Sequence, residues 1–202
     1  MLLNSWLKKL TARFGRAPVR PCRRNACRLT LEPLESRLAP AVHIWTGAPN
    51  GLWSLSSNWS GGAPTVAETG IQLVFPASTS VDNIAGLIVD RISCTAGSSV
   101  VLSTPLALNG SAAGDHVVTG SNVAVVFSGA AITLAGTQVQ FNTGLNGSVT
   151  IQNSLTGPTG FRMVGAGLLQ LQGTANYQGV TQINSGTTNS RILPRIQRNG
   201  IT

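Results

Sequence analysis

Side chains that could act in catalysis are few in this chain and lie far apart. His43 and His116 are its two histidines. A nucleophilic triad needs a nucleophile and a carboxylate within hydrogen-bond reach of a histidine, and no spacing around either residue indicates one. We therefore expect both histidines at the surface rather than in an active site.

The carboxylates give an equally weak signal. Enzymes that cleave polysaccharides need clustered carboxylates, or a basic residue near a metal. The aspartates are Asp82, Asp90 and Asp115, and their spacing does not place two of them on one face of the fold. The sequence therefore predicts no catalytic residue, no metal site, no cofactor and no enzymatic activity.

The cysteines do not form a zinc motif. Cys22 and Cys27 have no second pair and no nearby histidine to complete a metal site. We expect a transient disulfide or two free thiols there. Cys94 stands at the end of an expected strand and should be a small buried side chain. The core, and not disulfides, must then hold the fold together.

Three of the four tryptophans, Trp45, Trp53 and Trp59, lie in one short segment. Exposed indoles can stack on sugar rings, whereas buried indoles cover a large apolar area with few residues. The choice between these roles depends on the fold that the rest of the chain adopts.

The charge lies at the two ends of the chain. Charged residues make up 10% of the sequence and hydrophobic residues 42%, with 23 glycines and a formal charge of +8. Residues 1–41 hold nine Lys and Arg against two Glu, and residues 188–202 hold three Arg and no acidic residue. The body between them is almost uncharged. Such a composition excludes an acidic disordered tail and a helical bundle and favours an all-β protein.

Residues 1–41 are expected to form a basic export leader. Apolar residues at helical spacing, with Lys and Arg elsewhere, indicate a short amphipathic helix at a membrane surface, although a disordered leader is equally compatible. No apolar run is long enough to span a bilayer. An alternative is a basic arm that binds nucleic acid, but its arginine run contains no aromatic residue to stack on a base, so nucleic acid is the less favoured partner.

The segment 31–41 resembles the Leu-Glu-x-Leu-Glu-x-Arg-x-x-Pro-Ala segment near the start of planctomycete-type extracellular proteins. The matching residues are Leu31, Glu32, Leu34, Glu35, Arg37, Pro40 and Ala41. The resemblance implies export, an extracellular or cell-surface location, and transient contact of residues 1–41 with the membrane or the export machinery.

Short apolar runs separated by Gly, Asn, Ser and Thr follow the leader. Many alternate with a period of two, which predicts strands with one buried side. Ile132, Leu134 and Gly136 also recur as Leu169, Leu171 and Gly173. Irregular repeats of short strands are typical of a solenoid, and a β-sandwich is the competing fold. The expected strands cover residues 71–75, 86–92, 100–108, 122–127, 131–136, 139–141, 148–155 and 168–173.

The segment 165–187 is similar to the autotransporter-associated β-strand repeat. The matching residues are Gly165, Gly167, Leu169, Leu171, Gly173, Tyr177, Gly179, Thr181, Gly186 and Thr187, with departures at Ala175 and Thr188. The resemblance implies a right-handed parallel β-helix of the kind found in surface-displayed or secreted passenger regions. The residues agree with it, because Leu169 and Leu171 would point inward on one strand and Ile183 would point inward on the next.

A β-helix needs a cover over its first coil, because that coil otherwise exposes apolar side chains and unpaired backbone groups. Proteins that resemble this family often begin with a Trp-Thr-Gly, Trp, Asn-Trp arrangement, matched here by Trp45, Thr46, Gly47, Trp53, Asn58 and Trp59. We interpret the three tryptophans as this cap. The alternative, a carbohydrate-stacking platform, requires at least one exposed indole face beside polar groups.

The sequence thus predicts an all-β protein in four parts. These are a disordered or helical basic leader (1–41), a Trp-rich cap (42–68), the right-handed parallel β-helix (69–187) and an irregular basic tail (188–202), with the chain expected to be a fragment of a longer one. The predicted function is that of an exported surface or adhesion-type structural protein whose partners would be cell-surface polysaccharide or other surface proteins. A carbohydrate-binding or carbohydrate-cleaving β-helix and a basic-arm nucleic-acid binder are the alternatives.

Overall fold

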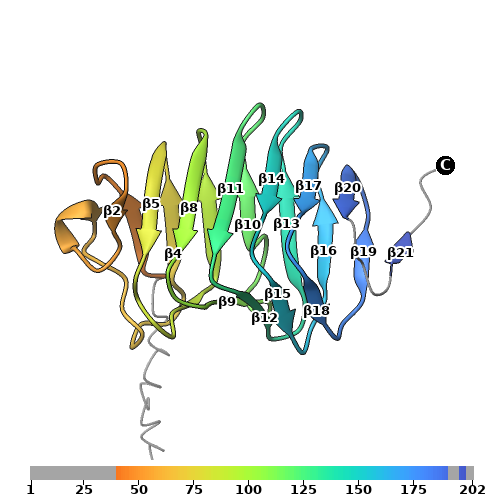
Figure 1. Cartoon of the computed structure of the whole chain (residues 1–202), viewed down its shortest axis with the longest axis horizontal. Helices are drawn as coiled ribbons and strands as arrows, with labels where there is room; N and C mark the ends of the chain where they lie inside the picture. The colour runs from red at the N-terminus through yellow and green to blue at the C-terminus, as the bar shows by residue number, and fades with distance from the viewer. Residues whose placement is uncertain (1–39, 191–195, 199–202) are drawn as a thin grey trace, which may run out of the picture. The chain divides into compact units, whose positions relative to one another are not determined.

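The computed structural model describes residues 40–190 and 196–198, which form a parallel β-solenoid (Figure 1). Consecutive strands pass in turn through three sheets, named A, B and C here. The only helical element of the described chain is the 3-10 turn η1 (Ser56–Asn58). No helix among these residues has the length and apolar character to cross a membrane.

The three sheets run along the solenoid, and their strands follow in the order of hydrogen bonding. Sheet A contains β3 (Trp59–Ser60), β1 (Val42–Trp45), β4 (Gln72–Phe75), β7 (Arg91–Cys94), β10 (Val117–Thr119), β13 (Val139–Thr143), β16 (Phe161–Val164), β19 (Thr181–Ile183) and β21 (Ile196–Arg198). Sheet B contains β2 (Gly51–Leu52), β5 (Ser78–Asp82), β8 (Ser98–Leu102), β11 (Ala124–Gly129), β14 (Ser148–Ile151), β17 (Leu168–Leu171) and β20 (Thr187–Ser190). Sheet C contains β6 (Ile88–Val89), β9 (Leu106–Asn109), β12 (Ile132–Ala135), β15 (Leu155–Gly157) and β18 (Ala175–Tyr177).

Five successive coils contribute a strand to each sheet, from β4, β5 and β6 to β16, β17 and β18. Each strand pairs in parallel with the equivalent strand of the next coil, for example β8 with β11 and β11 with β14. Among the described strands the antiparallel pair is β1 with β3, in the predicted cap. Parallel pairing across coils confirms the predicted parallel β-helix and contradicts the β-sandwich, which requires antiparallel sheets.

The core is a set of stacked side chains that follow from the two-residue alternation. In sheet B, Val100 pairs with Phe127, Phe127 with Ile151, and Ile151 with Leu171. All four side chains are buried, whereas the residues between them in each strand are half-buried. Each inward side chain is therefore covered by its equivalents in the neighbouring coils. The inward positions predicted for Leu169, Leu171 and Ile183 are confirmed.

The recurrence of Ile132 and Leu134 as Leu169 and Leu171 does not join equivalent positions. Ile132 and Leu134 lie on β12 in sheet C, whereas Leu169 and Leu171 lie on β17 in sheet B. The two segments look alike because every face of the solenoid uses the same alternation of apolar and polar residues. The sequence similarity therefore reflects a shared strand pattern. It does not mark equivalent strands of two coils.

The predicted irregular tail begins inside a strand. Strand β20 extends through Ser190, and β21 (Ile196–Arg198) pairs with β19. Ladder hydrogen bonds use only backbone groups, so Thr, Asn and Ser can continue a sheet without an apolar pattern. The prediction that residues 188–202 are irregular is therefore wrong for the part of the tail that the structure describes.

Removal of one inward side chain tests the stacked core. We expect Ile151→Ala to lower the free energy of unfolding by about 2–5 kcal/mol, because the cavity it leaves lies between Phe127 and Leu171. Its neighbour Thr150 faces outward and is half-buried, so Thr150→Ala should cost about 1 kcal/mol or less. Equilibrium urea unfolding of the two variants measures the difference. Equal losses would show that the alternation does not define the core.

Candidate functional site

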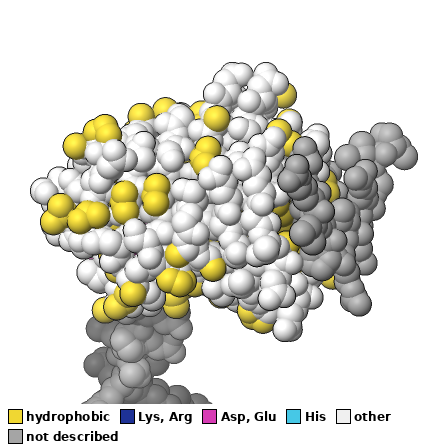
Figure 2. All heavy atoms as spheres, in the orientation of Figure 1, with side chains coloured by type: hydrophobic (Ala, Val, Ile, Leu, Met, Phe, Trp, Pro, Cys, Tyr) yellow, Lys and Arg dark blue, Asp and Glu magenta, His cyan; other side chains and the backbone are white. Residues whose placement is uncertain are grey.

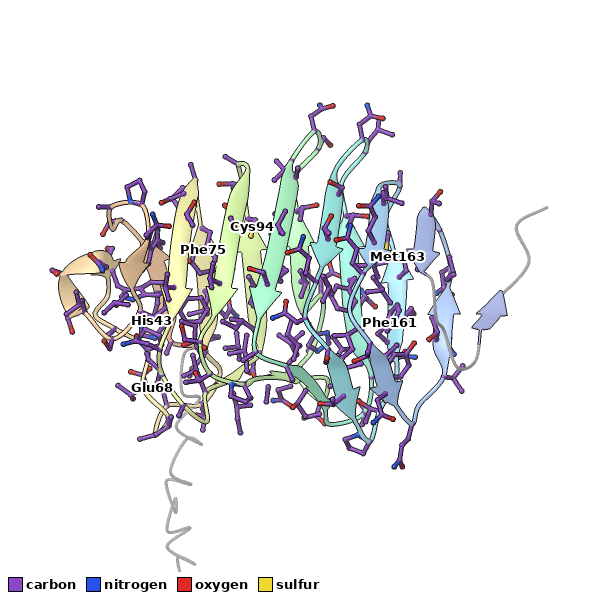
Figure 3. All side chains as sticks on the ribbon, in the orientation of Figure 1. His43, Glu68, Phe75, Cys94, Phe161 and Met163 are labelled. Atoms are coloured by element: carbon purple, nitrogen blue, oxygen red, sulfur yellow. The ribbon has the colours of Figure 1, made fainter. Side chains whose placement is uncertain are left out.

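The three tryptophans converge at the start of the solenoid. Trp45 of β1 lies opposite Trp59 of β3 in the antiparallel pair, and their ring centroids are 4.9 Å apart. Trp53 follows β2 and lies 5.7 Å from Trp59, edge to face. Phe75 of β4 contacts this cluster at a centroid distance of 5.6 Å from Trp53 and is labelled in Figure 3. Edge-to-face packing of this kind adds stability beyond the area that it buries.

The burial of these indoles supports the cap interpretation. The exposed fractions are 1% for Trp45, 0% for Trp53 and 5% for Trp59. The indole N–H of Trp59 donates to the Trp53 carbonyl at 2.8 Å. A carbohydrate-stacking platform needs an exposed indole face, and none of the three provides one. The ligand-stacking role proposed for these residues therefore has no surface in this structure.

The other residues of the cap motif hold the same cluster together. The Asn58 side-chain amide donates to the Leu52 carbonyl at 2.9 Å, and the Asn58 carbonyl accepts the Thr46 N–H at 2.9 Å. A Cβ at Gly47 would lie 2.7 Å from both Asn58 Cγ and a Trp45 ring carbon. Only glycine fits there without displacing the indole, which explains why the motif pairs Trp with Gly.

His43 is buried, and its expected surface position is wrong. It is 2% exposed on the inward side of β1. Its Nδ1 lies 2.8 Å from the Gly62 carbonyl and its Nε2 lies 3.1 Å from Glu68 Oε2. Glu68 Oε2 also accepts the Thr65 N–H at 3.0 Å. Figure 3 labels His43 and Glu68, which lie close together. The contacts tie the segment after β3 to β1, which is a structural role.

His116 is also buried, at 3% exposed, so its expected surface position is wrong as well. Its Nδ1 accepts the backbone N–H of Gln140 at 2.9 Å, which leaves the ring proton on Nε2. Burial lowers the pKa of His116 because it disfavours the charged ring. A neutral imidazole whose acceptor nitrogen is occupied cannot serve as a general base. His116 therefore fixes the coil-to-coil contact between β10 and β13.

Two aspartates lie at one corner of the solenoid, contrary to the expectation from their spacing. Asp90 and Asp115 each stand two residues before an inward residue of sheet A, and these residues, Ile92 and Val117, are paired. The carboxylates are therefore at equivalent positions of consecutive coils. Asp90 accepts a hydrogen bond from the Asn109 side chain at 2.8 Å. The described residues contain no group of three or more His, Cys, Asp and Glu that could hold a metal ion.

A chain of polar side chains crosses the outer face of sheet A from this corner. Asp115 accepts hydrogen bonds from the side-chain amides of Gln140 and Asn142, the latter at 2.8 Å. The side-chain oxygen Oε1 of Gln140 in turn accepts from Arg162, with Nε at 2.8 Å. Arg91 lies on the same face, on β7. The face can thus offer carboxylate, amide and guanidinium groups to a ligand. Sequence spacing missed it because the three contributing strands are brought together only by coil stacking.

Asp82 is a buried carboxylate on the inward side of β5. It is fully buried, accepts the Ile84 N–H at 2.9 Å and accepts the Thr104 hydroxyl at 3.1 Å. Burial raises the pKa of Asp82, although these two hydrogen bonds oppose the shift. The bonds connect the end of β5 to the start of the β8–β9 corner. Asp82 therefore has a structural role. It shares no hydrogen-bond partner with Asp90 or Asp115.

Cys94 is buried at the end of β7, as predicted. Burial raises the pKa of the Cys94 thiol to about 12, so the thiolate is negligible at neutral pH. The other two cysteines, Cys22 and Cys27, lie outside the described residues. So do Leu31, Glu32, Leu34, Glu35 and Arg37 of the export motif, whereas Pro40 and Ala41 are described.

The residues of the segment 165–187 occupy corners and inward positions of consecutive coils. Leu169 and Leu171 are inward on β17, and Tyr177 and Thr181 are buried on either side of the next corner, where their hydroxyl groups hydrogen-bond. A Cβ at Gly173 would overlap the Asn153 backbone, and a Cβ at Gly179 would overlap the Gly160 backbone. These positions require glycine because the coil below approaches too closely for any side chain. At these positions the segment shapes the solenoid.

One shallow hollow lies at the corner between sheets A and B in the last described coils. It is lined by Asn146, Gly147, Ser148, Ala166, Gly167, Leu168 and Thr187. The lining carries no charged or nucleophilic group apart from hydroxyls. This hollow is therefore a weaker candidate for a functional site than the outer face of sheet A.

Comparison of this chain with family models, with curated proteins and with solved structures finds no match. The similarity of residues 165–187 to a known repeat and that of residues 31–41 to an export segment therefore stay predictions.

Asp82 gives a pH-dependent test of the core. The pKa of Asp82 in the folded state is raised above the unfolded value of 3.8, so the ionised carboxylate destabilises the folded protein. This destabilisation is complete above the folded pKa and fades as the pH falls towards 3.8. Asp82→Asn keeps the acceptor for the Ile84 N–H, and its amide nitrogen can donate to the Thr104 hydroxyl in place of the bond that Asp82 accepts, so the charge is removed with both partners still bonded. We expect the variant to be more stable than the native protein at pH 7, with the gain shrinking as the pH is lowered. Urea midpoints measured from pH 4 to pH 7 would contradict this if the difference stayed constant.

The Cys94 thiol provides a second test. In a Cys22→Ser, Cys27→Ser background it is the one remaining thiol, and its burial and raised pKa should prevent reaction with a disulfide reagent at pH 8. We expect no reaction under native conditions and one equivalent in denaturant. Rapid reaction of the folded protein would show that the solenoid opens between β7 and its neighbours.

Proposed function

We propose that this chain is an exported structural protein of the cell surface or the extracellular space, an adhesion-type β-helix without catalytic activity. The observation that supports the proposal is the continuous stack of inward side chains through sheets A, B and C, exemplified by Val100, Phe127, Ile151 and Leu171. Such a stack makes a stiff body with flat outer faces, which suits display and contact better than the enclosure of a substrate.

The ionisable side chains of the body support a non-catalytic role. His43 contacts the Gly62 carbonyl and Glu68, His116 accepts a backbone N–H, and Asp82 is bonded inside the core. Each of these groups is thus engaged in holding strands or corners together. The chemistry left on the outside is hydrogen bonding by rows of amides and hydroxyls, together with Asp90, Asp115, Arg91 and Arg162 at sheet A. Polysaccharide hydroxyls and flat protein surfaces are the partners that such rows suit.

The start of the fold is compatible with removal of a leader. Strand β1 begins at Val42, directly after the export-like segment that ends at Ala41. A cut after Ala41 would leave every described strand intact, and it would remove one backbone contact, the hydrogen bond from the Gln72 N–H to the Ala41 carbonyl. Cleavage between the export-like segment and the solenoid would therefore interrupt no described strand.

The test is the location and the amino terminus of the native protein. Cytoplasm, cell surface and medium are separated, and the intact mass and the first residues of the chain are determined in each. We expect the chain outside the cell, beginning near Val42. A full-length chain confined to the cytoplasm would overturn the proposal and direct attention to the basic residues of the leader.

A pair of leader variants makes this test specific. Leu34→Ala with Glu35→Ala alters the export-like motif, whereas Arg20→Ala changes the leader outside it. We expect the first variant to accumulate in the cytoplasm and the second to be exported as efficiently as the native chain. Equal export of both would show that the motif does not direct the protein.

A further inference from the structure

The outer face of sheet B differs from that of sheet A because it carries no charge in its described strands. Its outward side chains are half-buried and come from β5, β8, β11, β14 and β17. In Figure 2 the surface turned to the viewer is almost entirely uncharged, and its hydrophobic side chains gather over the half that bears β2, β5 and β8 in Figure 1. We call this surface the B face, made up of Leu52, Thr79, Val81, Ser99, Val101, Val126, Ser128, Ser148, Thr150, Leu168 and Gln170.

An apolar row crosses one half of the B face. Leu52 pairs with Val81, and Val81 pairs with Val101, so the three side chains lie side by side on consecutive strands. Val126 of the central strand β11 lies two residues out of line with this row, since it pairs with Ser99, whereas Val101 pairs with Ser128. Leu52 is 40% exposed. The row spans three strands and ends at β11, where Ser128 lies opposite Val101.

The other half of the B face is mostly polar, with Leu168 as an apolar outward residue, and side-chain hydrogen bonds join its coils. The Thr150 hydroxyl donates to Gln170 Oε1 at 3.1 Å, and the Gln152 side-chain amide donates to Gln172 Oε1 at 3.3 Å. These bonds run between adjacent coils and keep the side chains flat on the sheet. Sheet A has a different outer face, because Arg91 and Arg162 lie on it and Asp115 adjoins it. Of these two faces, the B face is the one that can be dehydrated without burying a charge.

We propose that the B face is a self-association surface on which a second copy of this chain packs, sheet against sheet. An uncharged face is compatible with its own copy, since a two-fold axis brings no like charges together. Two flat sheets can pack about 10 Å apart with aligned strands, as in β-sandwiches. A partner recognised through charge, such as nucleic acid or an acidic peptide, would find no group here to pair with.

The size of the B face fits such a dimer. The seven strands of sheet B hold thirty residues, and with strands about 4.8 Å apart and about 3.3 Å per residue, the face covers about 480 Å². Two copies would bury about 1,000 Å² in total, which is the lower bound for a specific interface. The dimer should therefore dissociate on dilution and form at higher concentration.

The experiment compares one charge placed on the B face with the same charge placed on sheet A. Val126 of β11 and Val118 of β10 are both outward, half-buried valines of central strands. Sedimentation equilibrium of the full chain, under reducing conditions and up to about 200 µM, measures association. We expect the native protein and Val118→Lys to form the same dimer, and Val126→Lys to dimerise at least about tenfold more weakly, because the lysine would be buried against its own copy.

A cross-link provides a measurement that does not depend on the lysine variants. In the Cys22→Ser, Cys27→Ser background, Val126→Cys should be cross-linked to its own copy by a short bis-maleimide reagent, because the centre of the B face lies near the two-fold axis and sheets about 10 Å apart leave the two thiols too far apart for a direct disulfide but within reach of the reagent. Val118→Cys should remain uncross-linked at the same concentration. The proposal is overturned if the native chain stays monomeric throughout, if both lysine variants weaken association equally, or if the Val118→Cys chain cross-links as readily as the Val126→Cys chain.

Discussion

The structure depends on one constraint: an inward side chain of a coil is buried only by the equivalent side chains of the coils on either side. Val100, Phe127, Ile151 and Leu171 show this in sheet B, where each is covered by the next. The first coil has no such neighbour on its outer side. The three tryptophans take that place, and the antiparallel strand β3 covers the edge of β1. The cap is thus a consequence of stacking and not a separate domain.

The same constraint gives the few ionisable groups of the body their roles. A polar group that points inward or into a corner must find a partner in the adjacent coil. His116 takes a backbone N–H from β13, and Asp82 takes one bond from its own corner and one from Thr104 in the next coil. Groups that would signal catalysis in an isolated sequence are used here to hold neighbouring coils in register. Function, on this view, belongs to the outer faces.

Those faces are chemically different. The outer face of sheet A carries a connected chain of polar groups from Asp115 through Gln140 to Arg162. The B face is uncharged and has an apolar row through Val81 and Val101. Under the proposed function, the first face would contact hydrophilic partners and the second would contact a second copy of the chain. Both roles need only a rigid framework that holds each row of side chains flat, which parallel stacking supplies.

The sequence by itself determined the strand alternation, the buried positions of Leu169, Leu171 and Ile183, the buried Cys94 and the convergence of Trp45, Trp53 and Trp59, because these depend on local spacing and residue type. Only the tertiary structure decided which strands stack. The coil length varies, since nineteen residues separate Gln72 from its partner Arg91 and twenty-five separate Ile92 from Val117. Without a fixed period the sequence could not show that Asp90 and Asp115 share a corner, that His116 is buried between coils, or that Ile132 and Leu169 lie on different sheets. Those facts follow from register, and register is set by the summed packing of all coils.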